Sequence, residues 1–239
     1  MYGWRSKIGI LVVASDTTCE AELHKAAPEG ISIHSSRMEF PGAVTVESVG
    51  KLADYAEKAA ELLIPAGVNV IAFCCTSGSF IKGAGWDLEI INKLEKRFPN
   101  IKATTTSTAV LNALRTLNIG KVAVATPYLE EVNKSLKSFL EKEKFNVRRI
   151  KGLQIKEDLE TNALPAEKTY QLAKSLAQAD ADGILISCTS LRTFDIIGTI
   201  ERDLGMPVVT SNQATLWDVL RKAEIRGPLH GYGQLLTRL

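Results

Sequence analysis

The sequence predicts an α/β protein made of two similar halves, each a mainly parallel sheet flanked by helices. Short runs of β-branched and apolar residues alternate with longer segments of helical period, as in strands joined by helices. The apolar runs are nearly continuous, which is typical of strands buried on both faces. The same order of elements occurs twice in 239 residues, a length that suits one large domain or two small ones.

The first half contains four runs that we expect to form strands. They are "KIGILVVAS" (7–15), "ISIHSSRM" (31–38), "NVIAFCC" (69–75) and "IKATTT" (101–106). Apolar residues recur every three or four positions in the segments between and after them, which predicts helices over 44–67, 86–98 and 108–118. Because strands and helices alternate, this sheet should be parallel, with helices on both faces.

The second half repeats this alternation. Its expected strands are "KVAVAT" (121–126), "FNVRRIKG" (145–152), "DGILIS" (182–187) and "MPVVTS" (206–211). The helical period recurs in the segments that follow them, which predicts helices over 128–144, 165–179, 194–204 and 212–224. The same rule therefore predicts a second parallel sheet.

Two pairs of motifs indicate that the halves are related by duplication. The strand runs that begin at Lys7 and Lys121 are offset by 114 residues, and the Cys-Thr-Ser motifs that begin at Cys75 and Cys188 are offset by 113. A near-constant offset predicts two halves, residues 1–117 and 118–239, with one motif each. The C-terminal helix can pack back on the first half. Chance alternation is the competing explanation.

Charge and hydropathy exclude several classes of partner. The chain has 29 Lys and Arg against 27 Asp and Glu, with a net charge of +2, and the two signs are mixed along the predicted helices. This balance gives no electrostatic footprint for nucleic acid. No apolar run reaches the roughly 18–20 residues of a membrane span, and the first residues lack a signal-peptide pattern. We therefore expect a cytoplasmic protein without a membrane partner.

The sequence contains no recognisable site for a metal or cofactor. There is no C-x-x-C pair, and His24, His34 and His230 are isolated from one another and from the four cysteines. The G-x-G triplets in "KGAGW" and "HGYGQ" lack the spacing and the strand–turn–helix context of a nucleotide loop. We therefore expect a protein that works without metal and without cofactor.

The repeated Cys-Thr-Ser motif is the strongest indication of chemistry. Each copy follows a predicted strand, and ligands of open α/β sheets bind at the carboxyl ends of strands. If a helix begins next, its free N–H groups and dipole should lower the thiol pKa toward neutrality. A single cysteine there is more often a packing residue. The repetition favours catalysis by Cys75 and Cys188, whereas Cys74 and Cys19 should pack in the core.

The polar neighbours of these thiols have two possible roles. Thr76, Ser77, Thr189 and Ser190 can cap the following helix, and they can also hold a substrate carboxylate or a developing enolate oxygen. Gly78 would allow a ligand to approach the chain closely. Two thiols that face one carbon can add to it or exchange its proton without any cofactor.

Several stretches together resemble the aspartate/glutamate racemase superfamily, and most closely its maleate cis-trans isomerase branch. They are "GILVVASDTTCEAE", "SSRMEFPGAVTVE", "CTSGSF", "VAVATPYLEEVN", "SNQATLWDVLRKAEI" and "GYGQLL". The resemblance covers nearly the whole chain. It implies two Rossmann-like halves with the active site in the cleft between them, and a homo-oligomer, either dimer or tetramer.

The resemblance also implies roles for individual residues. Cys75 would be the nucleophile that adds to the double bond of maleate, and Cys188 the opposing general acid and base. Tyr128 and Asn162 would contact the substrate. The carboxylate cradle would be formed by Thr76, Ser77 and Thr189.

Two departures from the family pattern bear on the substrate. Asp16 stands where the family has asparagine, and a carboxylate beside a dicarboxylic substrate would repel it unless it is protonated or turned away. The usual proline of that loop is replaced by Val13 or Ala14. Arylmalonate decarboxylases share the fold and the second cysteine but have glycine in place of the first, so Cys75 argues against that activity.

The resulting hypothesis is a cofactor-independent isomerase of a small dicarboxylic or amino acid, with maleate to fumarate as the leading reaction. The alternatives are an aspartate/glutamate- or hydantoin-type racemase, an arylmalonate-type decarboxylase, and a non-catalytic carboxylate-binding protein. The predicted catalytic residues are Cys75 and Cys188. The predicted substrate-binding residues are Thr76, Ser77, Tyr128, Asn162, Thr189 and Asp16.

Overall fold

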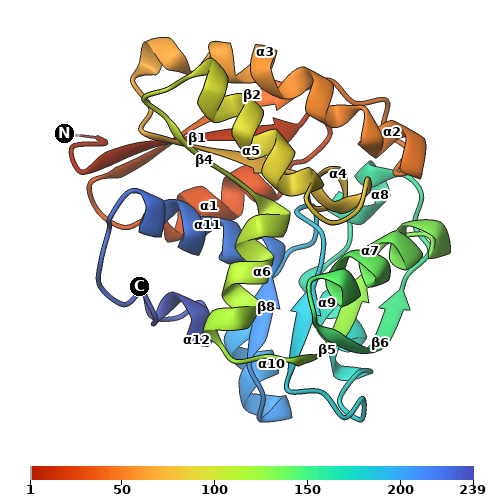
Figure 1. Ribbon diagram of the computed structural model, residues 1–239. Helices are drawn as coiled ribbons and strands as arrows, with labels where there is room; N and C mark the ends of the chain where they lie inside the picture. The colour runs from red at the N-terminus through yellow and green to blue at the C-terminus, as the bar shows by residue number, and fades with distance from the viewer. Residues whose placement is uncertain (1) are drawn as a thin grey trace.

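The computed structural model describes residues 2–239 and contains, within them, two four-stranded parallel sheets (Figure 1). The first has the order β2-β1-β3-β4 and the second the order β6-β5-β7-β8, so the strand order is the same in both. The strands are β1 (Ser6–Val13), β2 (Ile31–Met38), β3 (Val70–Cys74), β4 (Lys102–Thr105), β5 (Lys121–Thr126), β6 (Asn146–Gly152), β7 (Gly183–Ile186) and β8 (Val208–Thr210). This confirms the predicted fold class, whereas the exact division at 117/118 stays a prediction.

Helices flank both sheets. The first half has α1 (Cys19–Ala26), α2 (Val46–Gly50), α3 (Ala56–Glu61), α4 (Thr76–Phe80), α5 (Trp86–Arg97) and α6 (Thr106–Thr116). The second has α7 (Glu130–Lys142), α8 (Asp158–Asn162), α9 (Ala166–Lys174), α10 (Ile197–Leu204), α11 (Ser211–Lys222) and α12 (Gly233–Leu236). No helix in the described part of the chain is both long and apolar enough to cross a membrane.

The helix predicted over 44–67 is wrong as a continuous element. The segment is divided into α2, the 3₁₀ turn η1 (Leu52–Tyr55), α3 and the 3₁₀ turn η2 (Ile64–Ala66). Gly50 lies where α2 ends, and Pro65, which has no N–H to donate, lies in η2. The periodic pattern of apolar residues gave no warning of these breaks.

The core is built from the strands and the helix faces that cover them. Every residue of β3 and β7 is buried, as expected for central parallel strands. The edge strand β6 is largely exposed and carries Arg148, Arg149 and Lys151. The largest fully buried side chains include Trp217, Phe73, Phe80, Phe139 and Phe194.

Helices α6 and α11, which follow the last strand of each sheet, join the two halves. They pack against each other, and α11 also contacts β3, β4 and α1 of the first half. The helices begin alike, since Thr105 accepts a hydrogen bond from Thr108 N and Thr210 accepts one from Gln213 N. The helix that packs back on the first half is thus α11, whereas α12 packs on α10 and β8.

Candidate active site

Cys75 and Cys188 line one small cavity, although they follow strands of different sheets. Its volume of about 20 Å³ gives room for roughly one water molecule. Six of the eight predicted site residues line it, namely Cys75, Thr76, Ser77, Tyr128, Cys188 and Thr189. The remaining lining residues are Val13, Phe40, Val44, Val49, Leu52, Asp158 and Ser190.

The Cys75 thiol lies at the start of a helix. Cys75 is the N-cap residue of α4, and its Sγ accepts a hydrogen bond from Gly78 N at 3.3 Å and lies 3.7 Å from Ser77 Oγ. A Cβ atom on Gly78 would lie 3.1 Å from Cys75 Sγ and 3.3 Å from the Phe73 ring. Gly78 therefore allows the first turn of α4 to close tightly on the thiol.

The Cys188 thiol lies in a loop, and the expectation that a helix follows directly is wrong. Residues 187–196 form an irregular segment, and α10 begins only at Ile197. Cys188 N donates to Ser211 Oγ at 3.1 Å, and Ser211 Oγ is also 2.8 Å from Thr76 Oγ1. Asn212 Nδ2 donates to Thr189 O at 2.8 Å. The first turn of α11 thus holds the Cys188 loop. Through the contact between Ser211 and Thr76, the same turn also contacts the Cys75 motif.

A buried carboxylate from the other half also supports the Cys188 loop. Glu22, on α1, accepts hydrogen bonds from Thr193 N at 2.5 Å, Phe194 N at 2.8 Å and Asn212 Nδ2 at 2.8 Å. Burial raises the pKa of Glu22, and these donors oppose the shift. No sequence motif pointed to a role for this residue. Its one signal was an acidic side chain beside Leu23 on the buried face of α1.

Burial controls the ionisation of both thiols, and the expected shift toward neutral pKa is wrong for this structure. Burial raises the pKa of Cys75 to about 12, against the opposing hydrogen bonds from Gly78 N and Ser77. Burial, followed by the charge of Asp158, raises the pKa of Cys188 well above its usual value. The helix start at Cys75 reduces this desolvation effect without overcoming it, because the closed cavity removes the thiol from water.

Tyr128 contributes a hydroxyl group from the loop between β5 and α7. Its backbone is fixed by Tyr128 N donating to Thr126 Oγ1 at 3.2 Å and Asn133 Nδ2 donating to Tyr128 O at 3.1 Å. Its ring packs edge-on against Phe80, with 6.2 Å between centroids. Burial raises its pKa well above the usual value, so the hydroxyl stays protonated and can donate to a ligand.

Asp16 and Asn162 are buried but do not line the cavity. Asp16 Oδ1 accepts from Thr18 N at 2.8 Å and Cys19 N at 2.9 Å, so it holds the turn that leads into α1. Asn162 Oδ1 accepts from Thr17 N at 3.0 Å, while its Nδ2 donates to Asp158 O at 2.9 Å. In this structure both side chains therefore position the loop after β1.

Asp158 is the acidic residue that does line the cavity, and it was not among the predicted site residues. It begins α8, four residues before Asn162. Ser190 Oγ donates to its Oδ1 at 2.8 Å, and Ser15 Oγ donates to its Oδ2 at 2.6 Å. Asp158 N donates to Gly42 O at 3.0 Å. Asp158 therefore connects three segments: the loop after β1, the Cys188 loop, and the segment around Gly42 that leads into α2.

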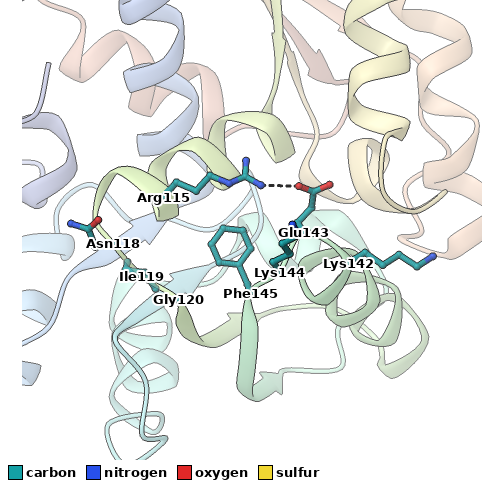
Figure 2. Close-up of a pocket in the computed structure, with 8 residues that line it drawn as sticks. All are labelled: Arg115, Asn118, Ile119, Gly120, Lys142, Glu143, Lys144 and Phe145. Carbon is teal, nitrogen blue, oxygen red and sulfur yellow. Dashed lines mark hydrogen bonds and ion pairs between the residues drawn. The ribbon is translucent and has the colours of Figure 1, made fainter.

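A larger hollow lies at the other end of the second sheet and lacks the features of a catalytic site. It has a volume of about 660 Å³ and is lined by residues 115, 118–120 and 142–145, next to the starts of β5 and β6. Figure 2 shows its Arg115–Glu143 ion pair, which has a 2.8 Å contact, beside the ring of Phe145. It contains no thiol and lies at the amino ends of the strands, away from the edge where ligands of such sheets bind.

Comparison with known proteins places the chain in a family. Residues 9–236 match the family model described as arylmalonate decarboxylase. The chain belongs to this family. Arylmalonate decarboxylase from Bordetella bronchiseptica is 35% identical over 200 residues, 81% of this chain and 82% of that protein. Maleate isomerase from Nocardia farcinica is 25% identical over 243 residues, 97% of this chain and 96% of that protein.

Solved structures agree with the observed fold. A mutant of the Nocardia farcinica maleate cis-trans isomerase, which carries a covalently bound succinylcysteine intermediate, has a TM-score of 0.91, covering 97% of this chain and 98% of that one at 24% identity. The predicted membership of the Asp/Glu racemase superfamily is confirmed. The chain is an enzyme of the arylmalonate decarboxylase and maleate isomerase family.

Proposed function

We propose that this enzyme is a cofactor-independent isomerase of small cis-unsaturated carboxylic acids, with maleate as the parent substrate. The observation that carries the proposal is that Cys75 and Cys188 line one cavity from two different sheets. A thiol on each side of a bound carbon can add to it from one side and protonate it from the other. The succinylcysteine adduct of the Nocardia relative supports such an addition.

The reaction uses the two sulfur atoms and no cofactor. Burial keeps Cys75 protonated in the closed cavity, so its thiol first gives its proton to solvent when the cavity opens. The resulting thiolate forms a C–S bond with one carbon of the double bond, and the Cys188 thiol gives its proton to the neighbouring carbon. Rotation about the resulting single bond changes the geometry. The Cys188 thiolate then takes a proton back, the C–S bond breaks, and the trans double bond forms. Both sulfur atoms return to their starting states.

The unequal surroundings of the thiols support this division of roles. Gly78 N and Ser77 Oγ face the Cys75 sulfur and stabilise its thiolate, as their lowering effect on its pKa indicates. Burial and then the charge of Asp158 raise the pKa of Cys188, which favours its protonated form; the same charge acts on Cys75, but there it ranks below the two hydrogen bonds that lower the pKa. Cys75 is therefore the better nucleophile and Cys188 the better proton donor.

Hydroxyl groups would hold the substrate carboxylate. Thr76, Ser77, Tyr128 and Thr189 all line the cavity and can donate hydrogen bonds. As the first two residues of α4, Thr76 and Ser77 also have backbone N–H groups with no acceptor within the helix. These donors would stabilise negative charge on the carboxylate as it becomes enolate-like.

Substrate binding requires the cavity to open. About 20 Å³ is too small for a four-carbon acid, and one wall consists of Phe40, Val44, Val49 and Leu52. This segment is attached by Val44 N donating to Lys156 O at 2.7 Å. If this hydrogen bond breaks and the segment moves away, the substrate can enter the cavity. When the segment closes again, it would exclude water from the reacting carbons.

A second candidate is decarboxylation of a malonic acid that bears an apolar substituent. The apolar wall of the cavity favours it, as does the 35% identity to the Bordetella enzyme. In that reaction carbon dioxide leaves and Cys188 protonates the remaining carbanion, so Cys75 is not required.

Proton NMR in deuterated water separates these reactions. The purified enzyme is incubated with maleate, phenylmalonate, aspartate or glutamate. Conversion of the maleate vinyl signal to that of fumarate supports the proposal. Loss of carbon dioxide from phenylmalonate without any vinyl change supports the decarboxylase. Exchange of the amino-acid Cα proton alone would contradict both.

A further inference from the structure

Asp158 gives the cavity an unbalanced negative charge. Among the described residues that line the cavity, Asp158 is the one with a charged side chain. No lysine, arginine or histidine is among these lining residues. None of the ion pairs found in residues 2–239 includes Asp158. Arg37 pairs with Glu20 at 3.1 Å, and Arg192, in the Cys188 loop, donates to Asn162 O at 3.4 Å.

The neighbours of the Asp158 carboxylate hold it as a hydrogen-bond acceptor. The residue is 5% exposed, and its carboxylate receives hydrogen bonds from Ser190 Oγ, Ser15 Oγ and, at 3.3 Å, Asn162 Nδ2. All three groups donate. A carboxylate oxygen can accept two hydrogen bonds. Oδ1 receives only the one from Ser190, so it can accept another from a ligand.

This arrangement disfavours a ligand with two carboxylates. One carboxylate can bind to the hydroxyls of Thr76, Ser77 and Tyr128, but a second one in so small a cavity would lie close to Asp158. Like charges repel strongly where water is excluded. A carboxamide has the shape of a carboxylate but carries N–H donors and no charge. It would fit the same space and donate to Asp158.

We infer that the preferred substrate is a monoanionic cis-enoic acid whose second polar group is a carboxamide, as in maleamate, the half-amide of maleate. This inference rests on the proposed isomerase function and narrows its substrate class. The carboxylate end binds the hydroxyl donors, and the amide N–H donates to Asp158 Oδ1. Because amide and carboxylate have the same shape, the selection depends on the buried acceptor and not on size.

The first test compares kcat/KM for maleamate and maleate. The rate of each reaction is measured from the change in the vinyl-proton NMR signals. The wild-type enzyme should prefer maleamate by roughly tenfold or more, since an unpaired buried polar group penalises the wrong ligand. Asp158→Asn offers an amide in place of the carboxylate and should reverse the preference toward maleate. A wild-type preference for maleate overturns the inference.

Asp16→Asn is the matched control. It removes a buried carboxylate whose charge also acts on both thiols, but Asp16 does not line the cavity. The Asp16→Asn variant should still prefer maleamate over maleate. If Asp16→Asn changes the preference as much as Asp158→Asn does, the effect is general electrostatics, and direct recognition by Asp158 is excluded.

Binding of saturated analogues tests recognition without chemistry. Succinamate and succinate lack the double bond, and their binding to the wild-type enzyme is measured by calorimetry. Tighter binding of succinamate supports the inference even if neither unsaturated acid is isomerised, in which case only the proposed reaction fails. Equal or tighter binding of succinate overturns the inference even if maleate is isomerised. Neither comparison depends on the folding of a variant.

Discussion

The two Cys-Thr-Ser motifs share a sequence and a position at the carboxyl end of a strand, but their supports differ. After Cys75 the chain enters α4 at once, and the helix supplies Gly78 N to the sulfur. After Cys188 no helix forms for eight residues. There the loop is held by Glu22, and by Ser211 and Asn212 at the start of α11.

This difference shows how one tripeptide can serve two chemical roles. A helix start presents N–H groups to a sulfur and favours its thiolate. A loop next to a carboxylate such as Asp158 favours the protonated thiol instead. The fold brings two cysteines together, and in the proposed mechanism their unequal supports make Cys75 the nucleophile and Cys188 the proton donor.

Removing either thiol should have the largest effect. Cys75→Ala and Cys188→Ala should each lower turnover by several orders of magnitude, and the double variant should lose little more, because the two sulfur atoms act as a unit. Cys188→Ala should still allow Cys75 to form a substrate adduct, seen by mass spectrometry as added mass on the Cys75 peptide. Near-normal turnover by Cys188→Ala would show that one thiol suffices. It would refute the proposal that the two motifs have different catalytic roles.

Loosening the support of one motif should come next. In Glu22→Gln, one of the two acceptor oxygens facing Thr193 N, Phe194 N and Asn212 becomes a donor. Leaving a buried N–H unpaired costs about 1–3 kcal/mol, so the free energy of unfolding should fall by that amount. We expect turnover to fall roughly tenfold as the Cys188 loop shifts, about 1.4 kcal/mol in the barrier.

The measurements for Glu22→Gln are urea denaturation, kcat and the alkylation rate of Cys75, which should not change. Glu20→Gln is the control. It lies on the same helix, and its ion pair with Arg37 is half-exposed, so it should cost less than about 1 kcal/mol. A Glu22→Gln variant that slows Cys75 alkylation as much as turnover would mean that the two supports are not separate.

The sequence was informative where one local pattern decides the structure. All eight predicted strands form. For the central strands β3 and β7 the reason is that a continuous apolar run can be buried only in the middle of a layered fold. Cys75 and Cys188 were selected because the motif is repeated, and their catalytic role stays a prediction. Glu22 and Asp158 could not be found this way, since their partners are 171 and 143 residues away, at Thr193 and Ser15. Such contacts depend on how the two sheets are placed, which periodicity does not encode.

Asp16 shows the opposite limit. Its place in the sequence suggested a substrate contact, whereas its carboxylate holds the turn that leads into α1. Aspartate side chains often accept a hydrogen bond from the backbone two residues further on in this way. The turn interpretation was therefore available from local chemistry alone, but the position of the side chain relative to the cavity was not.

High pH should reveal the buried Cys75 thiol. Its pKa is raised from 9.0 to about 12, so the folded state keeps a proton that the unfolded chain loses. The stability that this proton contributes is complete below about pH 9 and is lost as the pH rises from 9 to about 12. The loss should approach about 1.4 kcal/mol per pH unit.

Urea denaturation of the wild-type enzyme and Cys75→Ser at pH 8, 9, 10 and 11 measures this loss. The serine variant cannot lose that proton, so the two stability curves should run parallel up to pH 9 and converge above it. Parallel curves up to pH 11 would mean that the Cys75 thiol ionises as readily in the folded state as in the unfolded chain.

The smallest effect should come from the cysteine beside the nucleophile. Cys74 is fully buried, pairs with Val12 across the sheet, and is absent from the lining of the cavity. Removing its sulfur leaves a small cavity in the core, so Cys74→Ala should lower the free energy of unfolding by about 1 kcal/mol. Turnover should stay near the wild-type value, because successive residues of an extended strand point to opposite faces. An inactive Cys74→Ala together with an active Cys75→Ala would exchange their roles and refute the assignment of Cys75 as the nucleophile.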